Sequence, residues 1–271
     1  MTALAHLPTD TRRRLAQAGL IARGFLYCLV GILAIQIAFG SGSSQQASQS
    51  GALRTLAQQP GGTFLVALMG VGLIAYAAWR FMQFFTEKGS EDSDTKDAVM
   101  RASYILRALI YLGFAFLAFS IAFGSGGGGG GSSQQTITAQ IMKNVPGGVF
   151  LIGLVGLIIV GVGIYQAYQA FTTDFMEELQ QGRMSPTERV WVKRIGVAGH
   201  AARAVVYTMI GIFVVRAAVQ FDPQEAKGLD AALQELASQP FGTLLLTLVA
   251  LGLLLFGVYA IVRARYVDVS E

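Results

Sequence analysis

Three arginines lie within otherwise apolar runs, and each is followed four residues later by a tyrosine. The pairs are Arg23 with Tyr27, Arg107 with Tyr111, and Arg203 with Tyr207. Residues four apart share one face of a helix, so each guanidinium would lie one turn from a phenol. A guanidinium is a planar fork of donors that matches phosphate or carboxylate, which makes anion binding the chemistry that these residues could do.

A simpler interpretation is that these arginines anchor their helices. Arg203 lies about seven residues into its apolar run, roughly 10 Å from the nearer edge, and Arg23 and Arg107 are shallower. An arginine stem can cross much of that distance and place its charge among lipid headgroups. No Asp or Glu lies in any of the apolar runs to neutralise the charge. Both interpretations stay open: an anchor, or a cation that attracts a lipid phosphate, a small solute or a partner's carboxylate.

The apolar runs are long and numerous enough for a membrane protein. The chain has 271 residues, of which 53% are hydrophobic and 13% charged, whereas about a quarter charged is usual for a globular chain. A bilayer core about 30 Å thick requires about 20 apolar residues of helix. Six runs meet this length, at about 19–39, 62–85, 103–123, 148–171, 196–219 and 241–262. The sequence therefore predicts an all-α integral membrane protein with six transmembrane helices.

The distribution of Lys and Arg predicts the orientation, because short loops rich in these residues stay on the cytoplasmic side. One set of tails and loops holds twelve: Arg12, Arg13, Arg14, Lys88, Lys96, Arg101, Arg183, Arg189, Lys193, Arg194, Arg263 and Arg265. The other three loops hold only Arg54, Lys143 and Lys227. Both termini are therefore expected in the cytoplasm. The net charge of +4 follows from this topology and requires no nucleic acid partner.

The arginine-tyrosine pairs belong to an internal repeat. The odd-numbered runs contain "GLIARGFLYCLVG", "SYILRALIYLGFA" and "GHAARAVVYTMIG", and the even-numbered runs follow "AQQPGGTF", "KNVPGGVF" and "ASQPFGTL". We divide the chain into a cytoplasmic tail at 1–11 and repeats at 12–88, 98–172 and 189–266. Each repeat crosses twice and returns the chain to the same side, so only an axis along the membrane normal can relate the copies. This predicts three parallel two-helix repeats in a pseudo-threefold bundle.

Each loop inside a repeat ends in a short segment with an apolar face. Apolar side chains lie seven and four residues before a proline, as Leu53, Leu56, Ala139, Met142, Leu233 and Leu236. A spacing of three places each pair on one side of a helix. We therefore expect three short interfacial helices on the non-cytoplasmic side. The proline is expected in the first turn of the next span, where its missing N–H is not needed.

This layout resembles the bacterial family known as domain of unknown function 1206, whose members are predicted inner-membrane proteins of three two-helix modules. The resemblance runs from about Arg14 to Tyr266. It rests on the arginine-tyrosine openings, on "LAQQPGG" and "LASQPFG", and on endings such as "GLLLFGVYAIVRA". The second repeat departs, because isoleucine and methionine precede its "PGG" where the others have leucine. The resemblance implies the fold and a location in the bacterial inner (plasma) membrane, but no activity.

The sequence lacks the groups of catalytic and ligand residues that enzymes use. The single cysteine, Cys28, excludes an intramolecular disulfide and a thiolate metal cluster. The two histidines are far apart, with His6 in the tail and His200 in a span, which argues against a bis-histidine haem. No HExxH, serine elbow or nucleotide-binding motif is present. We expect no catalytic residue, no cofactor and no metal site, and we interpret His200 as a packed, hydrogen-bonded residue.

The sequence favours a non-enzymatic integral membrane scaffold or accessory protein that binds anionic lipid or an acidic partner surface. If the odd-numbered spans line the axis, three guanidiniums converge near the cytoplasmic face, with the phenols a turn deeper. The candidate anion-binding or lipid-binding residues are Arg23, Arg107, Arg203, Tyr27, Tyr111 and Tyr207. The expected partners are the bilayer and its anionic lipid, another membrane protein, or a second copy of the chain.

Two alternatives accompany this hypothesis. The first is a channel or facilitator for a small anion or solute along the pseudo-threefold axis, with the three arginines as a selective constriction. The second is an integral membrane enzyme, which would need carboxylates or histidines brought together at the membrane face. We interpret Arg80 and Arg216, near the ends of their spans, as snorkelling anchors outside any such site.

Overall fold

The computed structural model of the chain describes residues 9–40, 47–86, 94–124 and 132–267. Most of the expected cytoplasmic tail, at 1–8, lies outside these described residues. The described part is helical, with an isolated bridge between Leu179 and Val267 and no named strand. The long helices are α1 (Thr9–Ala38), α3 (Gly62–Thr86), α4 (Asp94–Ala122), α6 (Gly148–Thr172), α7 (Pro186–Val219) and α9 (Gly242–Tyr266). The short ones are α2 (Gln49–Ala57), α5 (Ser132–Asn144) and α8 (Leu229–Ser238), with single turns η1 (Asp174–Met176), η2 (Gln181–Arg183) and η3 (Pro223–Glu225).

The six long helices have the length and apolar composition needed to cross a membrane. They cover the six apolar runs to within one residue, which confirms the all-α class and six candidate spans. The helices α1, α4 and α7 begin about ten residues before their apolar runs, and in α7 a local cap, rather than hydrophobicity, defines where the helix starts. In α7, the Ser185 hydroxyl accepts from the Glu188 N–H at 3.2 Å and the Glu188 carboxylate accepts from the Ser185 N–H at 2.8 Å. This capping box begins the helix about ten residues before the predicted span.

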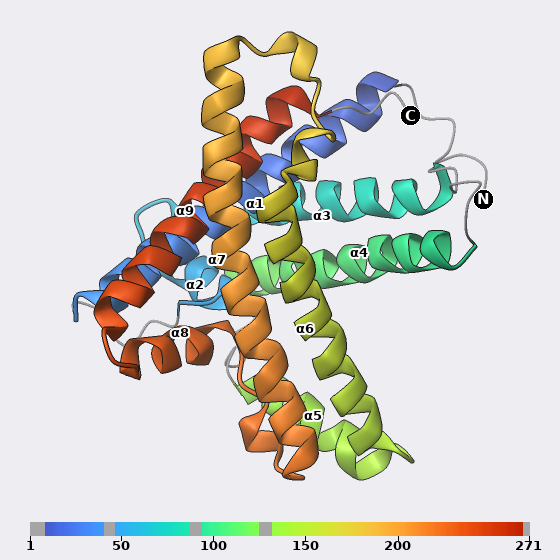
Figure 1. The fold of residues 1–271 in the computed structure, drawn as a ribbon, viewed down its shortest axis with the longest axis vertical. Helices are drawn as coiled ribbons and strands as arrows, with labels where there is room; N and C mark the ends of the chain where they lie inside the picture. Colours follow the sequence, from blue (N-terminus) through green and yellow to red (C-terminus); the bar gives the residue numbers. More distant parts are fainter. Residues whose placement is uncertain (1–8, 41–46, 87–93, 125–131, 268–271) are drawn as a thin grey trace.

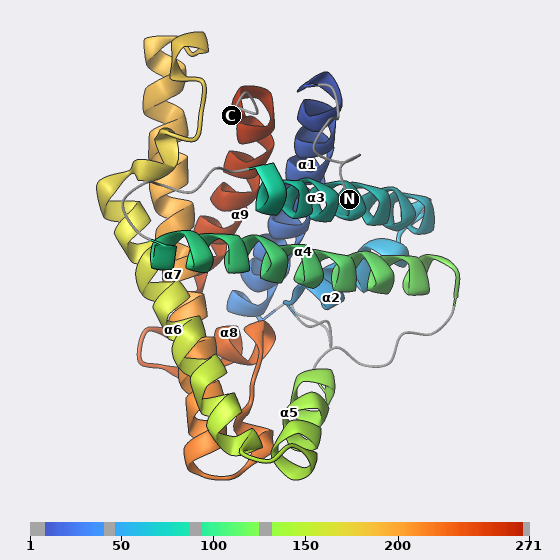
Figure 2. The same cartoon turned by 90° about the vertical axis from the view of Figure 1, so that its right-hand side faces the viewer.

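The three short helices α2, α5 and α8 lie where the sequence predicts them. Leu53 of α2 and Leu233 of α8 are fully buried, so these two helices use the predicted apolar face. In α5 the buried residue is Thr138, next to the predicted Ala139. Figures 1 and 2 show the first turn of α1 and the last turn of α9 toward the upper end of the molecule, and α5 and α8 toward the lower end.

The position predicted for the prolines is wrong by two residues. Pro60, Pro146 and Pro240 each lie in a tight turn that precedes a long helix, rather than in its first helical turn. The residue after each proline has a positive φ, of 72° at Gly61, 72° at Gly147 and 61° at Phe241. The turn is needed because the chain reverses sharply between the short and the long helix.

The long helices form three close antiparallel pairs: α1 with α9, α3 with α4, and α6 with α7. Each even-numbered span therefore packs on the odd-numbered span of the next repeat, and the last span packs on the first. Small residues allow this approach. A Cβ at Gly257 would lie 2.6 Å from the Gly24 carbonyl oxygen, and one at Gly163 would lie 3.2 Å from that of Ala204. These two contacts occupy equivalent positions in the α1–α9 and α6–α7 pairs.

The helices within a repeat pack in two of the three repeats. In repeat 1, a Cβ at Gly72 of α3 would lie 2.5 Å from the Cβ of Ala22 on α1, and Gly252 of α9 packs in the same way on Ala202 of α7. In repeat 2, α4 and α6 show no such packing among the described residues. Figures 1 and 2 show the α3–α4 pair running across the α6–α7 pair rather than alongside it. The two long helices of repeat 2 therefore lie apart, whereas those of repeats 1 and 3 pack together, and we call repeat 2 open and the other two closed.

Candidate anion-binding site

Five of the six predicted site residues lie together in the interior. Arg23 of α1 and Arg203 of α7 are each 8% exposed. The Nη2 of Arg203 donates to the Tyr207 hydroxyl at 3.1 Å, and that hydroxyl lies 3.3 Å from the hydroxyl of Tyr27. The guanidinium carbon of Arg23 lies 5.7 Å from the ring centre of Tyr27 and 5.8 Å from that of Tyr111 on α4. Side chains from all three odd-numbered spans therefore contribute to one buried cluster.

Aromatic rings from two even-numbered spans hold the guanidiniums. The guanidinium carbon of Arg203 lies 4.2 Å from the ring centre of Phe256 on α9, and that of Arg23 lies 5.1 Å from the same ring. On α3, the Tyr76 hydroxyl accepts from Nη1 of Arg23 at 2.8 Å. The negative face of an aromatic ring attracts a cation, and this attraction strengthens when both groups are away from water. Phe256 thus connects the two buried cations.

Arg80 also belongs to the cluster, and its interpretation as a snorkelling anchor is wrong. It is 4% exposed, its Nε donates to the Tyr76 hydroxyl at 3.0 Å and its Nη1 donates to Gln83 Oε1 at 2.7 Å. Its guanidinium carbon lies 4.4 Å from the ring centre of Trp79. The spacing of Tyr76, Arg80 and Gln83 on one helical face is the sequence signal for this network. Arg216, by contrast, is exposed near the end of α7.

A polar bridge joins Arg203 to α6, the helix that pairs with its own helix α7. The Gln166 amide fits with its oxygen 3.1 Å and 2.9 Å from the two Nη atoms of Arg203 and its nitrogen donating to His200 Nδ1 at 2.6 Å. His200 is buried and its ring stacks on Phe175, with ring centres 4.8 Å apart. The expectation that His200 is packed and hydrogen-bonded is confirmed. The role of Gln166 was missed, because its partner lies 37 positions away in the sequence.

Arg107 is the predicted site residue that the structure places outside the buried cluster. Its side chain is exposed on α4, although Tyr111 one turn away is buried. The equivalent arginines are covered by the close packing inside repeats 1 and 3, and repeat 2 lacks that packing. Three guanidiniums therefore do not converge at one level: Arg23 and Arg203 share an aromatic ring, and Arg107 lies at the edge.

The cluster carries more positive charge than its surroundings neutralise. In the described parts of the chain, the salt bridges join Arg263 to Glu178 and Lys227 to Glu225, and no carboxylate pairs with Arg23, Arg80 or Arg203. The Nε atoms of Arg23 and Arg203 are buried, and within the same residues they have no hydrogen-bond partner. Burying a cation without an anion is unfavourable, and phenol and amide oxygens offset only part of that cost. The arrangement suits an anion, and among the described side chains no cluster of His, Cys, Asp or Glu could hold a metal ion.

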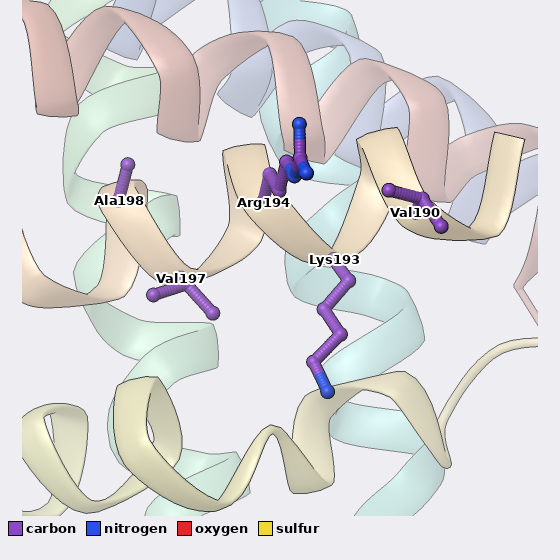
Figure 3. Close-up of a pocket in the computed structure, with 5 residues that line it drawn as sticks. All are labelled: Val190, Lys193, Arg194, Val197 and Ala198. Atoms are coloured by element: carbon purple, nitrogen blue, oxygen red, sulfur yellow. The ribbon is translucent and has the colours of Figure 1, made fainter. Parts of the chain in front are cut away.

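A separate groove of about 390 Å³ runs along the N-terminal part of α7. It is lined by Val190, Lys193, Arg194, Val197 and Ala198. Figure 3 shows Lys193 and Arg194 pointing to opposite sides of the helix, so their charges do not converge on one point in the groove. The buried cluster is therefore the better candidate for anion binding.

Six helices of this length and apolar composition, arranged as repeated pairs around buried arginines, are typical of multi-pass helical membrane proteins. The chain belongs to the family described as Domain of Unknown Function (DUF1206), which matches residues 18–99, 102–173 and 198–267. The resemblance and the repeat are thereby confirmed. A similar protein is "Uncharacterized protein YxxB" of Bacillus subtilis (strain 168), 34% identical over 254 residues, which are 94% of this chain and 90% of that protein. No solved structure was found to match, and neither description gives a sign of catalytic activity.

Proposed function

We propose that this protein is a non-enzymatic scaffold or accessory protein of the bacterial inner membrane that binds anionic lipid through its arginines. In this proposal both termini are cytoplasmic and the three repeats surround a pseudo-threefold axis. The cyclic pairing of α3 with α4, α6 with α7 and α9 with α1 supports the axis, whereas the crossing of the α3–α4 pair over the α6–α7 pair departs from exact threefold symmetry (Figures 1 and 2). The first turn of α1 and the last turn of α9 lie toward the same side of the molecule, as this orientation requires (Figures 1 and 2).

The observation that carries the proposal is the burial of Arg23, Arg80 and Arg203 without a neutralising carboxylate among the described residues. A lipid phosphate supplies that charge and accepts several hydrogen bonds from guanidinium groups. Because these side chains are at most 8% exposed, a ligand has to enter between helices, which a single lipid headgroup is small enough to do and the acidic surface of a folded partner is not. This favours a lipid headgroup over a partner surface as the ligand.

A channel along the axis is less well supported than a binding site. The hydroxyls of Tyr27 and Tyr207 meet at 3.3 Å, and Phe256 lies between the two guanidiniums. These side chains occupy the centre that a solute would have to cross. A chain that only binds lipid should therefore give no solute flux when it is reconstituted in liposomes.

Native mass spectrometry in mild detergent with added phosphatidylglycerol tests the proposal. The wild-type protein should carry a stoichiometric lipid adduct, and the double variant Arg23→Gln/Arg203→Gln should lose it. Arg216→Gln is the matched control, because Arg216 is exposed and lies outside the cluster. Circular dichroism establishes that each variant is folded. An equally abundant adduct on the folded double variant would contradict the proposal.

A further inference from the structure

The open side of repeat 2 has a cause in the sequence. Alignment of the repeats on their arginines and prolines places Leu106 of α4 where repeats 1 and 3 have Ala22 and Ala202. The same alignment places Ile158 of α6 where the other repeats have Gly72 and Gly252. The small pairs let the helix backbones approach closely. Leucine opposite isoleucine cannot fit into the same space, so α4 and α6 stay apart.

The separation leaves an apolar surface uncovered. We call it the open seam and define it by Leu106 and Ile110 of α4 and Ile158 and Val162 of α6. Leu106 is 52% exposed and Ile158 is 51% exposed. Only 17% of the apolar part of α4 and 22% of that of α6 is buried, compared with 44% to 61% for the other four candidate spans.

One cation lies at the open seam and connects it to the buried cluster. Arg107 is next to Leu106 on α4 and is exposed. Tyr111, one turn further along α4, lies 5.8 Å from the guanidinium carbon of Arg23. The seam therefore combines exposed apolar side chains with a positive group one helical turn from the buried Tyr111.

We propose that an anionic phospholipid occupies the open seam, with its phosphate on Arg107 and an acyl chain along Leu106 and Ile158. This inference rests on the proposed function and names the route by which the lipid reaches the arginine cluster: sideways, from the bilayer, between α4 and α6. An anionic head with long apolar tails complements a surface of this composition.

A second copy of the chain fits the seam less well. A twofold dimer through this surface would bring the two Arg107 side chains toward each other, because the same patch is used on both subunits. No nearby acidic residue would neutralise this pair, since α6 has no charged residue and the acidic residues of α4, Asp94 and Asp97, lie about three turns before Arg107. Like charges in an apolar interface would oppose such a dimer.

Fluorescence quenching by brominated lipid tests where the lipid lies. Ile158→Trp places a fluorophore in the open seam, and Leu251→Trp places one at a similar depth on α9, where Leu251 is 44% exposed. Both are made with Trp191→Phe, and the buried Trp79 is common to both. The vesicles are phosphatidylcholine with a minor fraction of phosphatidylglycerol dibrominated in its acyl chains. One basic residue near the bilayer surface raises the association constant for anionic lipid about fivefold. The association constant for phosphatidylglycerol should therefore be about fivefold higher for the Ile158→Trp protein than for the Leu251→Trp protein.

Two controls make the result decisive. Addition of Arg107→Gln should reduce quenching of the Ile158→Trp protein to the level of Leu251→Trp, and dibrominated phosphatidylcholine should quench both proteins equally. Equal quenching by phosphatidylglycerol in both proteins, or an excess that survives Arg107→Gln, would overturn the inference. Another result would also overturn it: a dimer in native mass spectrometry together with an Ile158→Trp fluorophore that brominated lipid does not quench, because a second copy of the chain would then cover the seam.

The proposed function and this inference fail in different ways. A stoichiometric adduct without excess quenching in the Ile158→Trp protein would place the bound lipid elsewhere, which removes the inference and leaves the proposed function. Excess quenching with an adduct that requires Arg23 and Arg203 supports both. Absence of both signals would overturn both.

Discussion

Repeats 1 and 3 differ from repeat 2 in how their two helices meet. Gly72 packs on Ala22 and Gly252 packs on Ala202, whereas Ile158 and Leu106 remain apart and exposed. The difference extends to the aromatic residue that follows each proline by nineteen positions: Trp79 and Tyr259 are 4% and 1% exposed, and Tyr165 is 51% exposed. Two small residues are enough to close a helix pair that lipid would otherwise separate. Repeat 2 lacks these small residues, and its arginine, Arg107, is exposed where Arg23 and Arg203 are buried.

The largest effect should come from disrupting the close packing of the two long helices in repeat 3, α7 and α9. Gly252→Leu would force a side chain into the backbone and side chain of Ala202 and into the Ala198 carbonyl. Overpacking of this kind costs about 1–3 kcal/mol, so we expect a marked fall in the temperature of unfolding in detergent. Gly161→Leu on α6 is the matched control, because nothing lies within 4 Å of a Cβ there. Gly161→Leu should be neutral or slightly stabilising. Equal destabilisation by both changes would show that the contact between Gly252 and Ala202 has no special role in stability.

The second prediction concerns a double variant designed to let α4 and α6 of repeat 2 pack together, as the helices of repeats 1 and 3 do. Leu106→Ala with Ile158→Ala removes the bulk that holds α4 and α6 apart, so lipid at the open seam should be displaced. We expect the phosphatidylglycerol adduct in native mass spectrometry to fall by about fivefold, the preference that one basic residue gives. Leu109→Ala with Leu157→Ala removes similar volume from neighbouring exposed positions. Loss of the adduct in this control as well would mean that general surface hydrophobicity, not the seam, holds the lipid.

The sequence predicts more of the helices than of their contacts. Apolar length and the recurring arginines reveal six spans and three repeats, because these signals are local and repeated. Gln166 joins the cluster through contacts with His200 and Arg203 that only folding creates, and no local pattern predicts them. For Arg80 the signal is local, because its partners Tyr76 and Gln83 lie on the same helical face. The sequence alone does not predict that Arg107 is exposed. Leu106 and Ile158 differ from the small residues at the equivalent positions, but this difference predicts a loss of packing only when the contacts of Gly72 and Gly252 are known.

The repeats also differ at the ends of their even-numbered spans. Arg263 of α9 forms a salt bridge with Glu178, and the equivalent residues of repeats 1 and 2 are the neutral Gln83 and Gln169. Burial opposes ionisation of Glu178, but the charge of Arg263, with smaller effects from Arg80 and Arg107, outweighs it and lowers the pKa of that carboxyl. Since the folded-state pKa is below the unfolded value of 4.5, the stabilisation is present at neutral pH and is lost as the pH falls through the folded-state pKa.

Glu178→Gln should therefore have a smaller effect than either seam change. The Glu178 side chain is 52% exposed, so solvent screening limits the loss to less than about 1 kcal/mol at neutral pH. The temperature of unfolding should differ between wild type and variant at neutral pH, and the difference should shrink well below pH 4.5. Glu177→Gln is the neighbouring control, because Glu177 has no salt bridge within the described residues. A difference that persists unchanged in acid would exclude the ion pair as its source.

The smallest effect concerns the tight turn before each even-numbered span. Repeats 1 and 2 place glycine at the position with positive φ, and repeat 3 places Phe241 there, with φ of 61° and an 83% exposed side chain. A non-glycine residue in the left-handed region costs about 1–2 kcal/mol, whereas glycine adds about 0.5–1 kcal/mol of chain entropy to the unfolded state. Phe241→Gly should thus stabilise the protein by a few tenths of a kcal/mol to about 1 kcal/mol, measured as a small rise in the temperature of unfolding. Phe241→Ala keeps the strain and removes the ring, so a rise in that variant too would attribute the effect to the exposed aromatic side chain instead of the backbone.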